Sequence, residues 1–201
     1  MTYRDLIYKN IFDECVLIAD YCSHMGIDIP ADAKVNRAIS MIIFQIITHF
    51  LQKLLQDIED GNVKELTQQN SALIKKIWET PSVQDAVEKK AEFQLNDSAQ
   101  FFFENLERIS TPNYVPEYSD ILRARQMTTG VQCIEFVLDG YQFVILDAGG
   151  QRSQRHDWSS FFEGLDAFIF VVAISEYDMV LAEDRATNRM HESLQGYQFC
   201  S

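Results

Sequence analysis

A chain of 201 residues with 47% hydrophobic and 23% charged residues has the composition of a folded globular protein of one or two domains. Its net charge of −13 argues against nucleic-acid binding and against a polybasic membrane patch, because both need clustered Lys and Arg. No apolar run reaches the ~20 residues of a bilayer span, and the N-terminus lacks a signal-peptide core and carries Thr2 where a myristoylation site needs glycine, so we expect no transmembrane segment and no lipidation motif.

The front of the chain, to about residue 125, is predicted to be almost entirely helical. Apolar residues at helical spacing predict one helix over residues 3–24 and a second over residues 32–59. The second has a wide apolar stripe, which suits a central helix packed on several neighbours. Its densest apolar run, Met41–Ile47, is interpreted as a buried helix segment. Asp60-Gly61-Asn62 then breaks the pattern.

Three shorter helices are predicted after this break, over residues 63–78, 82–91 and 98–109. Asp97 is the expected N-cap of the last one, because its carboxylate can accept hydrogen bonds from free backbone N–H groups of the first turn. Thr111-Pro112-Asn113 is expected to end that helix.

The hydrophobic period changes at about residue 131. Two alternating runs, 133–138 and 141–145, flank Asp139-Gly140 and predict a β-hairpin, because its tight turn needs positive φ. The continuously apolar run Ala167–Ile174 predicts a strand buried on both faces. A further helix is expected from about residue 181 or 184 to 194. These patterns predict an all-helical front half and an incomplete α/β back half.

The four cysteines are widely spaced and form no C-x-x-C pair, and the four histidines do not cluster with them; they are Cys15, Cys22, Cys133 and Cys200. This spacing argues against a structural zinc site. Reduced thiols in a cytosolic protein are the simplest interpretation.

The segment Asp147-Ala148-Gly149-Gly150-Gln151, at the end of a predicted strand, has the residue types of a phosphate and Mg²⁺ site. A carboxylate there can reach Mg²⁺ through water, two glycines let the backbone approach a phosphate, and a glutamine beyond them can orient an attacking water. By itself the pentapeptide is equally well an ordinary Gly-Gly turn, so its surroundings decide between the two interpretations.

Those surroundings resemble heterotrimeric G-protein α subunits over about residues 74–195, with several motifs in the family's order and spacing. The motifs are Leu95–Ala99 (the helical-domain loop that faces the nucleotide), Asp120–Arg125 and Thr128–Gly130 (first switch), Gly149–Ser153 with Arg155 and Trp158 (second switch), Leu181–Asp184 (third switch) and Asn188–Ser193 (the helix after it). The joint match excludes a helical scaffold unrelated to nucleotides.

The resemblance implies an all-α plus α/β fold. A Gα-type helical domain over residues 1–118 would precede an incomplete Ras-like (P-loop GTPase) domain over residues 119–201, which would carry the three switches. It also implies a GTP-hydrolysing switch in receptor signalling, with GTP or GDP and Mg²⁺ as cofactors. The implied partners are the G-protein βγ dimer, a G-protein-coupled receptor, and an effector enzyme or GTPase-activating regulator. The implied location is the cytoplasm, at the cytoplasmic face of the plasma membrane.

The same resemblance assigns roles to individual residues. Arg125 would be the catalytic arginine finger, which is typically worth ~10³-fold in rate, and Gln151 would position the attacking water. Thr128 would bind Mg²⁺ directly and Asp147 would hold its second shell. Taken singly, Arg125 would be interpreted as a solvated or salt-bridged arginine.

A larger set would surround GTP: Ser98, Leu122, Arg123, Ala124, Arg125, Gln126, Met127, Thr128, Asp147, Ala148, Gly149, Gly150 and Gln151. For Ser98, Leu122 and Arg123, packing, capping or surface charge is an equally open interpretation. The second and third switches would be locked by ion pairs among Arg152, Arg155 and Glu192. Trp158, with Phe161 and Phe162, would pack the switch helix or meet a partner.

Some residues depart from the family pattern. Ala148 stands where a larger apolar residue is usual, Met127 where lysine is usual, and His156-Asp157 where a basic pair is usual. The sequence also contains no G-x-x-x-x-G-K-[ST] and no N-K-x-D motif, and Gly196–Ser201 does not resemble the family's continuing helix.

These absences leave a second interpretation open, in which the chain is a truncated, non-hydrolysing isoform or fragment that acts as a binding module. Loss of the P-loop strand would leave apolar edges of the remaining strands exposed and would weaken phosphate binding. We therefore expect the helical half to be the better-folded part.

Overall fold

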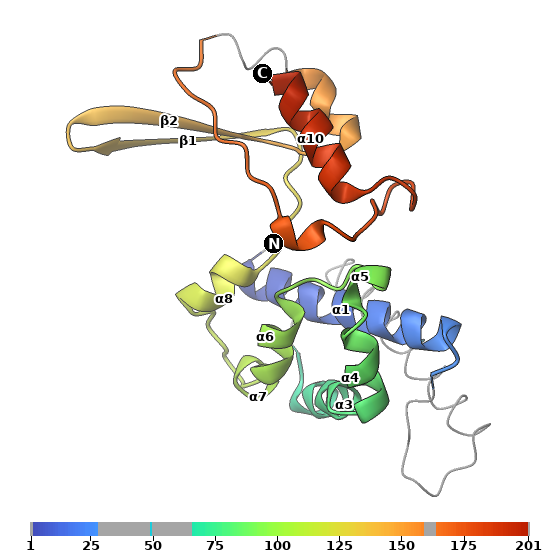
Figure 1. Ribbon diagram of the computed structural model, residues 1–201. Helices are drawn as coiled ribbons and strands as arrows, with labels where there is room; N and C mark the ends of the chain where they lie inside the picture. Colours follow the sequence, from blue (N-terminus) through green and yellow to red (C-terminus); the bar gives the residue numbers. More distant parts are fainter. Residues whose placement is uncertain (1, 28–48, 50–65, 159–163, 201) are drawn as a thin grey trace, which may run out of the picture. The chain divides into compact units, whose positions relative to one another are not determined.

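The computed structural model describes every residue except 1, 28–48, 50–65, 159–163 and 201 (Figure 1). The chain divides into two compact units, Met1–Arg125 and Gln126–Ser201, called here the helical unit and the switch unit. Apart from His49, the predicted helix over residues 32–59 lies outside the described residues, and so does Asp60-Gly61-Asn62.

Helix α1, Tyr3–His24, has the bounds that the sequence predicts. Its start is fixed by a capping box: the Asp5 N–H donates to Thr2 Oγ1 at 3.2 Å, and the Thr2 N–H donates to Asp5 Oδ2 at 2.9 Å. The apolar face of α1 is buried, with Ile7 and Phe12 at its centre. This helix is therefore the main core element of the helical unit.

The remaining helices of this unit are α3 (Gln68–Trp78), α4 (Pro81–Val87), α5 (Lys90–Phe93), α6 (Ala99–Glu104), α7 (Leu106–Ile109) and α8 (Tyr118–Arg123). In Figure 1 they lie around α1, which contacts α4, α5, α6 and α8, while α3 contacts α4, α6 and α7. Their apolar faces form one buried cluster that includes Phe12, Phe102, Phe103, Leu106 and Ile109.

Two of the predicted helices have different bounds in the structure. The helix expected from residue 63 begins at Gln68, because Thr67 is extended and its hydroxyl accepts the Asn70 N–H at 3.2 Å. The helix expected over residues 82–91 is two short helices, because the chain turns at Lys89 and then ends α5 with Gln94 in the left-handed region, at φ 63°.

The predicted helix over residues 98–109 is also broken, at Asn105. The Asn105 Nδ2 donates to the Phe101 carbonyl at 2.8 Å, so a side chain competes with the backbone at this turn. The expected N-cap, Asp97, is wrong by one residue: Ser98 is the N-cap of α6, and Asp97 forms an ion pair with Lys90 at 2.6 Å.

The switch unit begins with the predicted hairpin, which the structure confirms. Strands β1 (Val131–Leu138) and β2 (Tyr141–Ala148) pair antiparallel in a continuous register from Val131↔Ala148 to Leu138↔Tyr141. Asp139 and Gly140 form the turn with φ of 52° and 82°, the left-handed conformation that a two-residue hairpin loop needs. Asp147 lies near the open end of the hairpin, and Gly149 and Gly150, called here the glycine pair, follow directly after β2.

The prediction of a buried strand over Ala167–Ile174 is wrong. Residues 167–173 form no strand, and Ile174–Glu176 is a single 3₁₀ turn, η2. A strand needs a partner for its backbone groups, and in the part of the chain that the structure describes the only sheet is the β1–β2 pair. The fold is therefore mostly helical with a small antiparallel sheet, and the expected α/β layer is not formed by the described residues.

The last predicted helix begins and ends later than expected. Helix α10 is Arg189–Cys200, and Asn188 Oδ1 caps it by accepting the N–H groups of Met190 and His191. Residues 181–188 instead form a loop, in which Asp184 accepts the Ala186 and Thr187 N–H groups. The side chain at Asp184 thus stops the helix from starting there.

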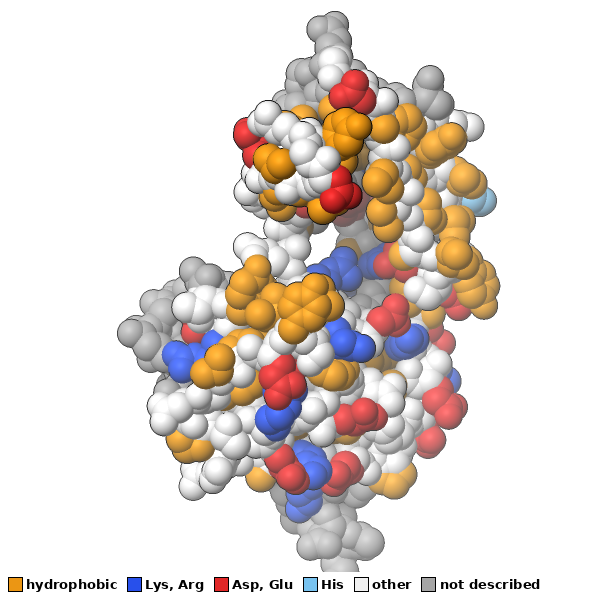
Figure 2. All heavy atoms as spheres, turned by 90° about the vertical axis from the view of Figure 1, so that its left-hand side faces the viewer, with side chains coloured by type: hydrophobic (Ala, Val, Ile, Leu, Met, Phe, Trp, Pro, Cys, Tyr) orange, Lys and Arg blue, Asp and Glu red, His pale blue; other side chains and the backbone are white. Residues whose placement is uncertain are grey.

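Apolar side chains are exposed over much of the switch unit, on both faces of the hairpin and along the segment after it. Figure 2 shows one face of this surface. Ile169 and Val171 are 90% and 86% exposed, and Met179 is the only buried hydrophobic side chain among the unit's described residues. Nearly all buried hydrophobic side chains of the described residues therefore lie in the helical unit.

Three of the four cysteines, Cys15, Cys22 and Cys133, are free thiols. Burial raises the pKa of the Cys22 thiol to about 11, so that it is protonated at neutral pH. Within the described residues, no helix has the length and apolar character needed to cross a membrane.

Candidate functional site

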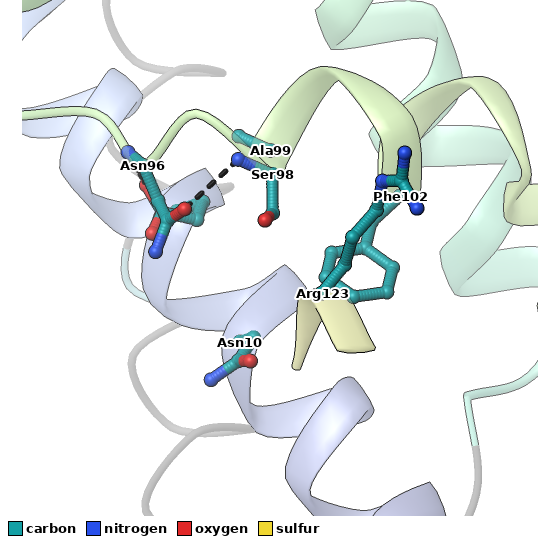
Figure 3. Close-up of a pocket in the computed structure, with 7 residues that line it drawn as sticks. Asn10, Asn96, Ser98, Ala99, Phe102 and Arg123 are labelled. Atoms are coloured by element: carbon teal, nitrogen blue, oxygen red, sulfur yellow. Dashed lines mark hydrogen bonds between the residues drawn. The ribbon is translucent and has the colours of Figure 1, made fainter. Parts of the chain in front are cut away.

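A shallow hollow, with a volume of only about 10 Å³, lies in the helical unit between α1, the loop before α6 and the end of α8 (Figure 3). Five of the seven residues that line it carry polar side chains; the lining consists of Asn10, Glu14, Asn96, Ser98, Ala99, Phe102 and Arg123. Of the residues expected at the nucleotide, Ser98 and Arg123 are thus brought together here.

The loop that carries Ser98 is held by hydrogen bonds to its backbone. The Ser98 N–H donates to Asn96 Oδ1 at 2.8 Å, the contact drawn in Figure 3, and the Asn96 N–H donates to Glu14 Oε2 at 3.1 Å. Glu14 therefore fixes the loop before α6 on α1, and Asn96 of this loop in turn orients Ser98.

The end of α8 presents three of the expected site residues in different ways. Arg123 places its guanidinium 4.3 Å from the centre of the Phe101 ring, a cation–π contact. Leu122 is exposed, and Ala124 packs partly buried against the core. The cation–π contact holds Arg123 against Phe101 of α6.

Arg125 follows α8 and is held by its backbone. Asn10 Nδ2 donates to the Arg125 carbonyl at 2.9 Å, and the Arg125 N–H donates to Asn10 Oδ1 at 2.7 Å. The Arg125 side chain is exposed. Sequence reasoning missed Asn10, because the two residues are 115 positions apart and no local pattern links them.

Asp120 is a second residue that sequence reasoning gave no role. It is 0% exposed and accepts four hydrogen bonds: two from the Arg108 guanidinium at 2.6 and 2.8 Å, one from the Tyr114 hydroxyl at 2.7 Å and one from the Glu117 N–H at 2.9 Å. The Arg108 hydrogen bonds lower the pKa of Asp120 to about 2, although burial opposes them. Asp120 thereby fixes the start of α8, the helix that ends just before Ala124 and Arg125.

Glu14 gives the hollow a group that titrates near neutral pH. Burial raises the pKa of this carboxyl from 4.5 to about 7; the Asn96 N–H lowers it, Asp13 adds to the rise, and Arg125 lowers it. Between pH 4.5 and about pH 7, Glu14 keeps its proton in the folded state and has released it in the unfolded chain. The free energy of unfolding therefore falls as the pH rises from 4.5 to about 7.

We expect Glu14→Gln to remove this pH dependence. In a Trp158→Phe background, urea unfolding followed by the buried Trp78 should show wild type losing stability between pH 4.5 and 7 relative to Glu14→Gln. Glu88→Gln, which removes one exposed acid, controls for the change in net charge. Parallel pH profiles for wild type and Glu14→Gln would contradict the assignment.

In the switch unit, the two residues expected at Mg²⁺ lie together. Thr128 Oγ1 donates to Asp147 Oδ2 at 3.1 Å. The segment after Thr128 is tied to the segment after Asp147 by the Gly149 N–H, which donates to the Gly130 carbonyl at 3.0 Å, and by the Gly130 N–H, which donates to Gln154 Oε1 at 3.0 Å. Gln126 and Met127 precede this contact and are exposed.

The glycine pair has one position that needs glycine for steric reasons. A Cβ at Gly149 would lie 2.9 Å from the Thr128 carbonyl oxygen, whereas a Cβ at Gly150 would meet nothing within 4 Å. Gly149 thus permits the close approach of the two segments. Ala148, partly buried, ends β2, and the exposed Gln151 is the N-cap of the 3₁₀ helix η1, Arg152–Asp157.

Glu192 on α10 connects the other two residues expected to form a latch, Arg152 and Arg155. It is 4% exposed and accepts from Arg152 Nη2 at 2.5 Å and from Arg155 Nη1 at 2.6 Å. These hydrogen bonds, the Arg152 pair first, lower the pKa of Glu192 against the effect of burial. The structure therefore brings Arg152, Arg155 and Glu192 together in one network.

Asp184 extends this network and was not predicted as a member. It accepts from Arg152 Nη1 at 2.8 Å and from the Thr187 hydroxyl and N–H at 2.5 and 2.8 Å. The Thr187 contacts, followed by the backbone and Arg152 contacts, lower the pKa of Asp184. Two carboxylates from separate segments thus share Arg152.

Trp158 lies at the end of the 3₁₀ helix and contacts both the glycine pair and the network. Its Nε1 donates to the Gly149 carbonyl at 3.1 Å, and the Arg155 guanidinium lies 5.5 Å from its ring centre. Arg155 Nε also donates to the Gly150 carbonyl at 3.0 Å. Phe161 and Phe162, expected beside Trp158, are outside the described residues, so the predicted packing among the three is not tested.

The donor set suits Mg²⁺ in combination with phosphate. The described residues hold no group of three or more His, Cys, Asp or Glu side chains placed to bind a metal alone. Thr128 and Asp147 supply two hard oxygen donors, and Mg²⁺ sites commonly combine one or two such protein ligands with water and substrate phosphates. The residues present therefore fit this ion as a partial site.

Comparison with known proteins places the chain in a family. A family model described as "G-protein alpha subunit" matches residues 1–199. The guanine nucleotide-binding protein alpha-4 subunit of Caenorhabditis briggsae is 40% identical over 195 residues, which are 97% of this chain and 52% of the relative. The alpha-7 subunit of Caenorhabditis elegans is 36% identical over 191 residues, 95% of this chain and 50% of the relative.

A third relative matches more closely over a shorter stretch. The Caenorhabditis elegans alpha-16 subunit is 48% identical over 143 residues, 71% of this chain and 40% of the relative. The chain spans about half the length, or less, of these curated relatives. Since the family model covers nearly all of its residues, the chain belongs to the G-protein α subunit family.

Proposed function

We propose that the chain works in a GTP-hydrolysing signalling switch, in which it supplies the groups that sense and cleave the γ-phosphate. Arg125 stabilises the charge that develops on the phosphate, and Gln151 orients the attacking water. Ser98, Leu122, Arg123 and Ala124 face the nucleoside part. The signal passes between a receptor and an effector enzyme at the cytoplasmic face of the membrane, and the βγ dimer and GTPase-activating regulators are the further partners.

The observation that supports this proposal most is the network centred on Glu192. Exposed ion pairs add little stability, yet here two arginines of one segment converge on a single buried carboxylate of another. Arg155 also bonds the Gly150 carbonyl, so the network is linked to the glycine pair that would meet the γ-phosphate. Such a link lets a phosphate-dependent movement of the glycine pair change the fit of α10.

Mg²⁺ would be held by the Thr128 hydroxyl directly and by Asp147 through water, and it would neutralise the charge of the phosphates. The remaining members of the proposed set contribute backbone rather than side-chain groups. Gly150 offers its peptide N–H just beyond β2, Ala148 and Gly149 form the backbone that leads to it, with the Gly149 N–H bonded to the Gly130 carbonyl, and Gln126 and Met127 connect Arg125 to Thr128.

A second function is favoured by one observation, the apolar surface of the switch unit. If the chain holds no nucleotide, this surface suits a binding module for a regulator or an effector, in line with the absent G-x-x-x-x-G-K-[ST] and N-K-x-D motifs.

Nucleotide binding separates the two functions. We expect the purified chain with Mg²⁺ to bind a fluorescent GTP analogue with a Kd of roughly micromolar or below. Thr128→Ala should weaken Mg²⁺-dependent binding, whereas Lys76→Ala, on the exposed side of α3, should have no effect. If the wild-type chain binds no analogue with or without Mg²⁺, the switch function is wrong for this chain and the binding-module function is favoured.

A further inference from the structure

Helix α1 contacts both segments of the helical unit that the proposed function places at the nucleotide. Asn10 bonds the backbone of Arg125, and Glu14 accepts the N–H of Asn96 in the loop that carries Ser98. The two side chains are four residues apart and therefore project from the same face of the helix. One rigid helix face thus holds both segments.

The Asn10 contact fixes orientation as well as position. A carboxamide carries a donor and an acceptor on one planar group, so Asn10 satisfies the C=O and the N–H of the same residue at once. Two bonds on either side of one Cα restrain the peptide planes that flank it. Asn10 itself is held in place because its neighbours Ile7 and Ile11 are buried in the core.

The two hydrogen bonds between the Asn10 carboxamide and the Arg125 backbone, called here the clamp, lie just beyond the end of α8. The Ala124 N–H still bonds the carbonyls of Asp120 and Ile121, but Arg125 follows the C-cap of α8 and its backbone takes its partners from Asn10 instead. Without Asn10, the chain after α8 would lose both of these bonds. The residue held in this way is the one whose exposed guanidinium the proposed function assigns to catalysis.

We propose that Asn10 is a positioning residue for Arg125: its carboxamide fixes the Arg125 backbone on α1, so that the guanidinium is presented from a fixed Cα. This role rests on the proposed function, since it needs Arg125 to act on a nucleotide. The clamp itself does not depend on nucleotide, which allows the two to be tested apart.

Amide hydrogen exchange at Arg125 tests the clamp in the full chain without nucleotide. Asn10→Ala should accelerate exchange of the Arg125 N–H by about tenfold or more, because it removes the acceptor of that group. Asn10→Asp keeps an acceptor but loses the donor, so its exchange should be intermediate. Lys9→Ala, at the neighbouring, partly exposed position that pairs with Asp13, is the matched control and should change nothing at Arg125.

Single-turnover cleavage of GTP at saturating Mg²⁺ and nucleotide tests the positioning role. Asn10→Ala should slow cleavage by roughly 10- to 100-fold, the scale expected for a misplaced catalytic group, while the Kd of the fluorescent analogue changes by less than about threefold. In an Arg125→Ala background, Asn10→Ala should have no further effect, since the group that it positions is gone.

The outcomes separate the clamp from the function. Unchanged Arg125 exchange in Asn10→Ala overturns the clamp, and accelerated exchange with unchanged cleavage overturns the positioning role. An additive effect of Asn10→Ala in the Arg125→Ala background also overturns it. If the wild-type chain cleaves no GTP, the proposed function fails together with the positioning role, and the exchange result shows independently whether the clamp exists.

Discussion

Replacing Asp120 with alanine is expected to lower the free energy of unfolding of the helical unit by about 3–5 kcal/mol. The substitution leaves the Arg108 guanidinium and the Tyr114 hydroxyl without their common acceptor, next to a core from which water is excluded. It also removes the acceptor of the Glu117 N–H and with it part of the N-terminal cap of α8. Arg108 is partly exposed, so the lower end of the range is the more reasonable value.

Urea unfolding followed by Trp78 fluorescence, in a Trp158→Phe background, measures this effect. Asp120→Asn keeps one acceptor and should lose less stability. The matched control is Glu117→Gln: Glu117 also faces Arg108, at 3.7 Å, but it is exposed, so the change should cost about 1 kcal/mol or less.

The pH dependence gives a second check on Asp120. The pKa of Asp120 is about 2 in the folded state, below its ordinary value of 3.8. The stability that the Asp120 carboxylate adds is therefore complete above pH 3.8 and is lost as the pH falls through about 2. The wild type and Asp120→Asn should therefore keep a constant difference in stability between pH 5 and 8. A loss below about 1 kcal/mol for Asp120→Ala would contradict the role given to this carboxylate.

The second large effect is expected at Glu192. Changing it to glutamine removes the charge on which Arg152 and Arg155 converge and should destabilise the contact between η1 and α10 by about 1.5–3 kcal/mol, the range for hydrogen bonds to charged groups. Because Arg155 contacts the Trp158 ring, the fluorescence of Trp158 should change as the network loosens.

Thermal unfolding followed by Trp158, in a Trp78→Phe background, compares Glu192→Gln with the wild type. Glu183→Gln is the control, because it removes one acid from the exposed loop before Asp184. Identical unfolding curves for Glu192→Gln and wild type would show that the network contributes nothing to the coupling of the two segments.

Much of the local fold could be predicted because it depends on short-range chemistry. Helix α1 follows from its apolar periodicity, and the hairpin follows from Asp139-Gly140, whose positive φ values the turn requires. The break at Asn105 could not be predicted from periodicity, since it arises from a side chain that competes with the backbone at Phe101. The strand over 167–174 failed for a different reason: an apolar run becomes a strand only where a partner strand pairs with it.

The candidate site also has residues that the sequence identified and residues that it did not. Arg152, Arg155 and Glu192, and the pair Thr128 and Asp147, were identified through the resemblance to the family, and each set lies within hydrogen-bonding distance in the switch unit. The supporting residues, by contrast, were given no role: they are Asn10, Glu14, Asp120 and Asp184. Asp120 and Asp184 lie within the quoted first-switch and third-switch motifs, but the hydrogen bonds that give them their roles appear only in the folded structure. Asn10 and Glu14 bond backbone groups 115 and 82 positions away, so no local pattern points to them.

The central claim, that this chain senses a γ-phosphate, is tested most directly by Trp158 fluorescence in the Trp78→Phe background. With Mg²⁺ present, a non-hydrolysable GTP analogue should change the emission and GDP should not, because the proposed function has the γ-phosphate move the glycine pair, to which the Trp158 ring is hydrogen-bonded. The difference should be lost in Glu192→Gln. Equal emission with the GTP analogue and with GDP, or an undiminished difference in Glu192→Gln, would contradict the account.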